Sequence, residues 1–234
     1  MNSVRLMTWN IHGAFGCNPR FDLDRVIALV KSHAPDIVAL QEIDSRSVRA
    51  HVGNPFDVLQ AALGSHGIGA RTVVTADGEY GQALISRWPL ENTQIHDLSN
   101  PEREPRRAIR TDVATPFGPL RVIATHLGLT LRERRSQAIA LLEMLGHLDR
   151  PTVALGDFND WLWAGSVRRS LGRALPGFSR HRTFPARLPL FELDRIYLFP
   201  ASALIGSRTD HRARELSDHL PVIADIEVVH EARS

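Results

Sequence analysis

The sequence contains very little cysteine and lysine and no long apolar run. Cys17 is the only cysteine, which excludes an intramolecular disulfide and a zinc site built from several thiolates. No run of about 18 apolar residues occurs, so the sequence predicts no membrane-spanning helix. Lys31 is the only lysine, and the other 27 of the 28 basic residues are arginines. Arginine suits bidentate contacts with phosphate, but a compositional bias of the genome explains the lack of lysine more simply.

A strong excess of either charge is also missing. The formal net charge is +2, which is too small to indicate a nucleic-acid-binding protein by itself. The first residues, MNSVRLMTWNIHG, run almost directly into strand-like sequence, without the charged region, apolar region and cleavage site of a signal peptide. Together with the single cysteine, this predicts a cytoplasmic protein, and we expect it to be a monomer.

Short apolar, β-branched runs recur along the chain and predict strands. They lie at 4–11, 36–41, 82–86, 109–114, 120–127, 151–157, 194–199 and 221–229. Several lack the alternation of a sheet with one solvated face, which indicates strands that are covered on both faces. Apolar residues at helical spacing predict helices over 22–33 and 131–148. Strands that alternate with helices, together with hairpin-like pairs such as 109–127, favour a mixed-sheet α/β protein.

The chain is long enough for a substantial core and shows no obvious linker. With 234 residues, of which 43% are hydrophobic, we expect one domain over residues 1–234. The segments 96–107 and 165–190 are rich in proline and arginine and predict exposed loops. Long loops in a compact domain are functional more often than idle.

Polar residues interrupt the apolar runs where the predicted strands end. In open α/β sheets, ligand sites gather at the carboxyl ends of strands, so one pocket could hold all of these side chains. Taken singly, each has a simpler explanation as a turn former, a helix cap or a structural histidine, but their joint occurrence in several segments favours a site. They are Asn10, Glu42, His126, Asp157, Asn159, Asp218 and His219. Carboxylate and amide oxygens suit a hard cation such as Mg²⁺ or Mn²⁺, which leaves the histidines for chemistry.

The motifs around these residues stand in the order and approximate spacing of a known family. They are TWNIHG, QEID, GQALISRWPL, ATHLGL, LGDFND, TFP with LDRIY, and LSDHLPV. Over residues 4–228 the chain resembles the endonuclease/exonuclease/phosphatase superfamily, and THLGL, GDFNDW and TFPARLPLFELDRIY look like a subgroup of small bacterial members. The resemblance implies the DNase-I-like fold, a four-layer α/β sandwich of two packed mixed sheets flanked by helices. Most characterised members are Mg²⁺-dependent phosphoesterases that act on DNA, RNA, phosphoinositides or sphingomyelin.

The resemblance also implies a metal site. Glu42 of the QE motif looks like the principal ligand of Mg²⁺, or of Mn²⁺. Asn10 of TWN and Asp218 of SDH resemble its neighbours in that site. Whether one or two metal ions bind is left open.

Further residues resemble the family's catalytic groups. Asp157 of GDFN resembles the residue that orients or deprotonates the attacking water, and Asn159 the one that holds the phosphate. His219 is similar to the catalytic histidine, and Asp194 of LDRIY to the carboxylate that orients it. His126 of THL matches a second, substrate-contacting histidine of the DNase-like and sphingomyelinase-like branches. The general base is left open among Asp157, His126 and His219.

Two positions depart from the family pattern. The DNase branch pairs its second histidine with a glutamate, and Glu79 matches that glutamate only with a shifted alignment. A phosphate-contacting arginine is expected near REPRRAIR, where Arg103, Arg106 and Arg107 compete. We favour Arg107 because it stands just before a predicted strand.

The leading interpretation is therefore a Mg²⁺-dependent phosphodiesterase that acts on nucleic acid or on a phospholipid head group. Arginines at 102–110 and 132–135 would serve a nucleic acid, whereas exposed apolar residues at Trp161, Trp163 and 184–191 would serve a lipid. A catalytically inactive phosphate-binding module is one alternative. A metal-free serine-type hydrolase is another, although Ser217 lies too close to His219 for an easy triad and no G-x-S-x-G motif occurs.

Overall fold

A computed structural model describes residues 2–15, 21–46, 53–161 and 165–228 of the chain. Two six-stranded sheets form its centre. The first sheet consists, in spatial order, of β11 (Leu204–Thr209), β12 (Val222–Glu227), β1 (Ser3–Asn10), β2 (Ile37–Asp44), β4 (Gly78–Ser86) and β3 (His66–Thr75). The second consists of β5 (Leu90–Asp97), β6 (Arg107–Thr115), β7 (Gly118–His126), β8 (Thr152–Asp157), β10 (Asp194–Phe199) and β9 (Gly177–Phe178).

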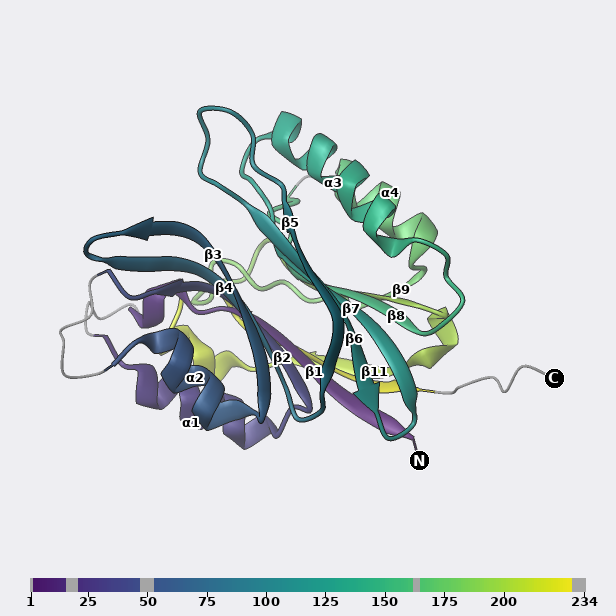
Figure 1. The fold of residues 1–234 in the computed structure, drawn as a ribbon, viewed down its shortest axis with the longest axis horizontal. Helices are drawn as coiled ribbons and strands as arrows, with labels where there is room; N and C mark the ends of the chain where they lie inside the picture. The colour runs from purple at the N-terminus through teal and green to yellow at the C-terminus, as the bar shows by residue number, and fades with distance from the viewer. Residues whose placement is uncertain (1, 16–20, 47–52, 162–164, 229–234) are drawn as a thin grey trace.

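Helices cover the outer face of each sheet, which gives four layers (Figure 1). The helices α1 (Leu23–His33) and α2 (Pro55–Leu63) pack on the first sheet, and α3 (Leu131–Leu145) and α4 (Ser166–Ala174) pack on the second. Three short 3₁₀ helices, η1 (His12–Ala14), η2 (Ala201–Ala203) and η3 (His211–Glu215), lie in connections. The four-layer sandwich of two mixed sheets predicted from the sequence is confirmed.

Each sheet contains one central parallel pair. β1 pairs with β2 in parallel through the α1 crossover, and β7 pairs with β8 in parallel through α3. The other strand pairs are antiparallel. Parallel neighbours end at the same edge of their sheet. The carboxyl ends of β1 and β2 therefore lie together, as do those of β7 and β8.

Three apolar cores explain why the central strands lack polar alternation. Along β1, Leu6 packs between the two sheets, whereas Met7 and Trp9 pack against the helices outside. Leu155 and Ala154 of β8 divide in the same way between the inter-sheet core and the α3 and α4 core. Burial of each large apolar side chain contributes about 1.5–3 kcal/mol, so both faces of these strands stabilise the sandwich.

The ends of the predicted helices follow from local signals. Asp22 accepts a hydrogen bond from the Arg25 backbone N–H at the start of α1. Thr130 and Glu133 form a capping box at the start of α3. α3 ends at Leu145, three residues before the predicted end, because Gly146 turns the chain with φ of +59°.

The prediction of a continuous loop over residues 165–190 was wrong. This segment contains α4 and the short strand β9. Val167 and Leu171 of α4 are buried against α3 at helical spacing, but the arginines around them obscure the pattern. Among the described residues, no helix combines the length and the apolar character needed to cross a membrane. Cys17 and Trp163, which the sequence singled out, lie outside the described residues.

Candidate functional site

Strand register brings three predicted site residues together at one edge of the second sheet. His126 at the end of β7 is the register partner of Asp157 at the end of β8. Asp157 is in turn the partner of Asp194, the first residue of β10. All three side chains are buried, and the most exposed of them, His126, is 7% exposed. The rigid ends of three neighbouring strands therefore hold them in place.

Asn10 links this group to the first sheet. Its side-chain Nδ2 donates to Glu42 Oε1 at 2.8 Å and to Asp157 Oδ2 at 3.1 Å. Asn10 ends β1 and is only 1% exposed. The amide thus connects a carboxylate of each sheet across the top of the sandwich, which is where the sequence placed a common pocket.

Two site residues have unusual backbone conformations. Glu42 has φ of +56° and lies where the register between β2 and β4 shifts, between Leu40 and Ile43. Asn159 has φ of +49°, and its backbone N–H donates to Asp157 Oδ1 while its side-chain Nδ2 donates to the Leu127 oxygen, both at 2.9 Å. A non-glycine residue in the left-handed region costs on the order of 1–3 kcal/mol. The surrounding hydrogen bonds maintain both conformations and aim both side chains at the site.

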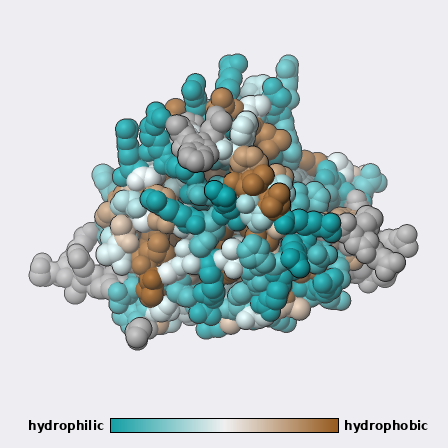
Figure 2. Space-filling view, turned by 180° about the vertical axis from the view of Figure 1, so that it is seen from behind, coloured by the Kyte–Doolittle hydropathy of each residue, from teal (hydrophilic) through white to brown (hydrophobic). Residues whose placement is uncertain are grey.

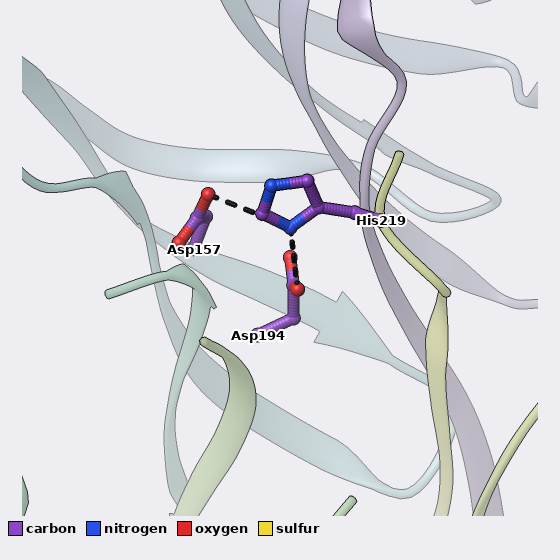
Figure 3. A group of neighbouring side chains, drawn as sticks. All are labelled: Asp157, Asp194 and His219. Atoms are coloured by element: carbon purple, nitrogen blue, oxygen red, sulfur yellow. Dashed lines mark hydrogen bonds and ion pairs between the residues drawn. The ribbon is translucent and has the colours of Figure 1, made fainter. Parts of the chain in front are cut away.

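His219 is held between two carboxylates (Figure 3). Its Nδ1 lies 2.8 Å from Asp194 Oδ2 and 3.8 Å from Asp157 Oδ2. The Phe184 ring packs against the imidazole with a centroid separation of 4.8 Å. Burial alone would lower the pKa of His219, but the charges of Asp194 and Asp157 outweigh burial and raise it to about 10. At neutral pH this imidazole carries a positive charge in the metal-free protein.

His126 has the opposite environment. Its Nδ1 lies 3.1 Å from Nη1 of Arg106, and its Nε2 lies 3.6 Å from Asp157 Oδ2 and 3.9 Å from Glu42 Oε1. Burial first, and the charge of Arg106 second, lower the pKa of His126 to about 4. A guanidinium group donates and never accepts, so Nδ1 must be the acceptor and Nε2 must carry the proton. His126 therefore presents an N–H to the two carboxylates.

The arginine that reaches the site is Arg106. Its side chain is 5% exposed and also pairs with Glu104 at 3.1 Å. Arg107, which the sequence favoured, supplies its backbone oxygen to Gln82 at 2.6 Å, and its substrate-contacting role stays a prediction. Glu79, which was considered as a glutamate partner of the second histidine, instead binds Arg71 and Asn54. Among the described residues, Arg106 is the side chain that pairs with His126 Nδ1.

His12 is a site residue that the sequence did not single out. Its Nδ1 lies 3.5 Å from Glu42 Oε2 and 3.6 Å from Asp218 Oδ1. Burial alone would raise the pKa of Glu42, but a hydrogen bond from His12 and the charge of His126 lower it to about 2. The only sequence signal was its place in TWNIHG, two residues after Asn10.

Two donor groups could bind a metal ion. Asp157, Asp194 and His219 offer atoms within 4.8 Å of one another, but the short Asp194–His219 hydrogen bond already occupies the imidazole nitrogen that faces the carboxylates. The second group is the predicted one, with Asn10, Glu42 and Asp218. The Glu42 and Asp218 side chains are 24% and 40% exposed. Oxygen donors with access to solvent fit a hard cation that keeps part of its water shell.

An open pocket of about 580 Å³ reaches Glu42 of this donor group. Its lining includes His12, Glu42, Tyr80, Asp44 and Glu104. The tyrosine ring is covered by the guanidinium of Arg46 at 4.8 Å, and burial raises the pKa of its hydroxyl. The pocket therefore gives solvent access to Glu42, and its lining combines three carboxylates with the cationic Arg46.

Two further residues of the sequence motifs have structural roles. Asp160 is buried, and its Oδ2 accepts from the Arg168 backbone N–H at 2.9 Å, at the start of α4. Ser217 is also buried, and its hydroxyl donates to the Asn10 backbone oxygen at 2.7 Å while accepting from the His219 backbone N–H. With both capacities used by backbone, Ser217 is poorly placed to act as a nucleophile.

Comparisons with known proteins agree with this arrangement. A model described as the Endonuclease/Exonuclease/phosphatase family matches residues 7–219. The uncharacterized protein YbhP of Escherichia coli strain K12 is 32% identical over 247 aligned residues, which cover 96% of each chain.

Solved structures show the same fold. An endonuclease/exonuclease/phosphatase from Beutenbergia cavernae has a TM-score of 0.80 at 20% identity, covering 98% of this chain and 72% of its own. The catalytic domain of human Nocturnin, solved with a bound sulfate anion, has a TM-score of 0.73 at 20% identity, covering 97% and 95%. At such low identity, these structures show a likeness of fold alone.

Proposed function

This chain belongs to the endonuclease/exonuclease/phosphatase family, whose members are hydrolases of phosphoester bonds, and from that premise we propose that it is a Mg²⁺-dependent phosphodiesterase. The observation that carries the proposal is the continuous chain of contacts from Glu42 through Asn10, Asp157 and His219 to Asp194. It joins a solvent-accessible carboxylate to a buried histidine–carboxylate pair across both sheets. A structural ion pair alone would not require strained backbone at Glu42.

The metal would be held by Glu42, Asn10 and Asp218. Their oxygens are the donor type that Mg²⁺ prefers, and the low pKa of Glu42 keeps that carboxylate ionised. When bound, Mg²⁺ would neutralise charge on the phosphate oxygens and lower the barrier to attack by water. Mn²⁺ has the same ligand preference and is a second candidate ion.

Asp157 is the group that we assign to the attacking water. Asn10 and the Asn159 backbone N–H fix both of its oxygens. Burial, followed by the negative charge of Asp194, raises the pKa of Asp157. A carboxylate with a raised pKa is a stronger base than an exposed one. His126 cannot take the water proton at Nε2, because Arg106 already fixes the proton on that nitrogen.

The remaining groups would hold the phosphate. The Nε2–H of His126 and the second side-chain N–H of Asn159 can donate to non-bridging oxygens. The charged His219, held by Asp194, can stabilise or protonate the leaving oxygen, a contribution of about 10²–10⁴-fold for a positioned acid. Asp194 would thus act as a positioning residue for His219.

Hydrolysis of bis(p-nitrophenyl) phosphate with and without EDTA tests the proposal. We expect turnover that stops in EDTA and returns with excess Mg²⁺. Turnover that resists EDTA would favour the serine-type hydrolase. No turnover from folded protein, on this diester or on supercoiled plasmid and phospholipid vesicles, would favour the inactive phosphate-binding module.

A further inference from the structure

Six of the ten large, exposed apolar side chains in the described part of the protein belong to two short regions beside the site. In the first region, Leu129 is 65% exposed, Leu131 43% and Trp161 49%. In the second, which is the loop 184–191, Leu188 is 68% exposed, Leu190 52% and Phe191 38%. Exposed apolar side chains that gather beside a site indicate a binding surface, whereas singly scattered ones are normal on a monomer.

The first region is hydrogen-bonded to the end of β8 and the residues after it, which carry Asp157 and Asn159. The Leu127 backbone N–H donates to the backbone carbonyl oxygen of Asp157 at 2.9 Å, and the Leu127 carbonyl oxygen accepts from the Asn159 side chain. Buried Arg134 donates to the Leu129 oxygen at 2.5 Å, and its guanidinium lies 6.0 Å from the Trp161 ring. One buried arginine therefore fixes the segments that carry Leu129 and Trp161, and their side chains face solvent.

The second region is attached to the catalytic histidine. Phe184 contacts the His219 ring, and Phe184 and Phe191 exchange backbone hydrogen bonds of 3.2 and 2.9 Å. The Ala186 backbone N–H donates to the backbone carbonyl oxygen of Asp218 at 2.7 Å. The loop is thus a closed hairpin fixed to the site at its base. Its tip presents Leu188 and Leu190 outward, where they add nothing to the core.

Exposed arginines lie next to this apolar surface. Arg132 and Arg135 are exposed on the first turns of α3, and neither has an ion-pair partner within the described ranges. Leu131, Arg135 and Ile139 share one helix face, and Ile139 is 60% exposed. Figure 2 shows hydrophobic patches amid hydrophilic surface on one face of the molecule. Aliphatic side chains beside arginines without ion-pair partners would complement a partner that has an apolar interior and negatively charged groups at its surface.

We propose that these two regions seat the protein on an anionic phospholipid bilayer, so that the substrate is a phosphodiester in the lipid head-group region. The proposal rests on the phosphodiesterase function proposed above and names its substrate class. Arginines alone would also suit nucleic acid, but single-stranded bases require aromatic stacking partners and duplex DNA requires contacts to phosphate. Trp161 and Phe191 could stack on bases and the arginines could contact phosphate, but four of the six exposed side chains are leucines, which do neither. Insertion of these leucines among acyl chains removes them from water.

Vesicle co-sedimentation in EDTA tests the surface without any turnover. Wild-type protein should sediment with vesicles of phosphatidylcholine and phosphatidylglycerol more strongly than with phosphatidylcholine alone. The double variant Leu188→Ser/Leu190→Ser should bind at least tenfold more weakly, with its melting temperature unchanged because neither side chain packs in the core. Arg132→Gln/Arg135→Gln should selectively reduce the preference for phosphatidylglycerol, by about fivefold per charge.

Ile205→Ser is the matched control. Ile205 is 56% exposed and lies near the start of β11 in the first sheet. This part of β11 pairs with the end of β12, whereas Asp218 and His219 precede the start of β12. This variant should bind as wild type does. Absence of wild-type binding, or equal loss in the Ile205 control, would overturn the bilayer proposal. Because bis(p-nitrophenyl) phosphate is soluble, EDTA-sensitive turnover without vesicle binding would retain the phosphodiesterase and reject the membrane, and added plasmid DNA would then be the next substrate.

Discussion

Replacement of Arg106 by methionine tests the protonation state of His126. In the wild-type protein Arg106 donates to Nδ1 of His126, so we expect the Nε2–H tautomer of a neutral imidazole. Methionine keeps much of the side-chain volume and removes both the donor and the charge. Nδ1 can then take a proton, either in the other tautomer or in the charged imidazolium.

The size of the change follows from the two causes that act on His126. Its pKa lies at about 4, against 6.5 for an unperturbed histidine, and burial contributes more than the charge of Arg106. Removal of the smaller of these two causes should raise the pKa from about 4 toward 6.5 and enlarge the charged fraction of His126 at a given pH. The loss of one buried, charge-assisted hydrogen bond should also destabilise the fold by about 1–3 kcal/mol.

Nitrogen-15 NMR of the histidine rings measures both quantities in the metal-free protein. His126 should show protonated Nε2 and unprotonated Nδ1 in wild type, and a raised pKa in Arg106→Met. Arg107→Met is the control, since Arg107 follows directly in the chain and the hydrogen bond to the His126 imidazole comes from Arg106. A wild-type ring with its proton on Nδ1, or equal titration in both variants, would refute the assignment of His126 as a donor.

Three further predictions concern the other site residues. His219 has a folded-state pKa of about 10, above its unfolded value of 6.5, so its charge should stabilise the metal-free fold fully below pH 6.5 and lose this effect as the pH rises through 10. Urea unfolding across this range should show the decline in stability. Asp194→Asn should flatten this pH dependence and lower kcat about 10²-fold. Glu42→Gln should abolish the rise in melting temperature that Mg²⁺ produces in wild type, and an unchanged rise would exclude Glu42 as a ligand. Ser217→Ala should retain activity within about tenfold and lose about 1 kcal/mol of stability, whereas complete loss of turnover with an intact fold would restore the serine mechanism.

The central strands could be predicted because their burial on both faces leaves a continuous apolar run in the sequence. Strands such as β1 and β8 are buried on both faces, and continuous apolar runs of strand length report that directly. Edge strands were not predicted for the same reason. β5, with the sequence LENTQIHD, is largely exposed and owes its conformation to pairing with β6.

The site was predictable to the extent that it depends on strand ends. Asn10 and Asp157 interrupt apolar runs, and parallel strands deliver such residues to a common edge. The role of Arg106 could not be read in this way, since Arg103 and Arg107 have the same chemistry and only the path of the chain decides which one reaches His126. The contacts of a surface loop with a partner strand are set by packing, and a one-residue difference changes which side chain faces the site.

The comparison of Asp157→Asn with Asp44→Asn tests the central claim most directly. Both carboxylates are the last residues of strands beside the site. Asp157 accepts a hydrogen bond from Asn10 and approaches His219, whereas Asp44 lines the pocket and binds Arg46. With bis(p-nitrophenyl) phosphate and Mg²⁺, Asp157→Asn should reduce kcat by about 10²–10⁴-fold, and Asp44→Asn should stay close to wild type. Equal activities in the two variants, with both folded, would contradict the assignment of the attacking water to Asp157 and with it the proposed phosphodiesterase site.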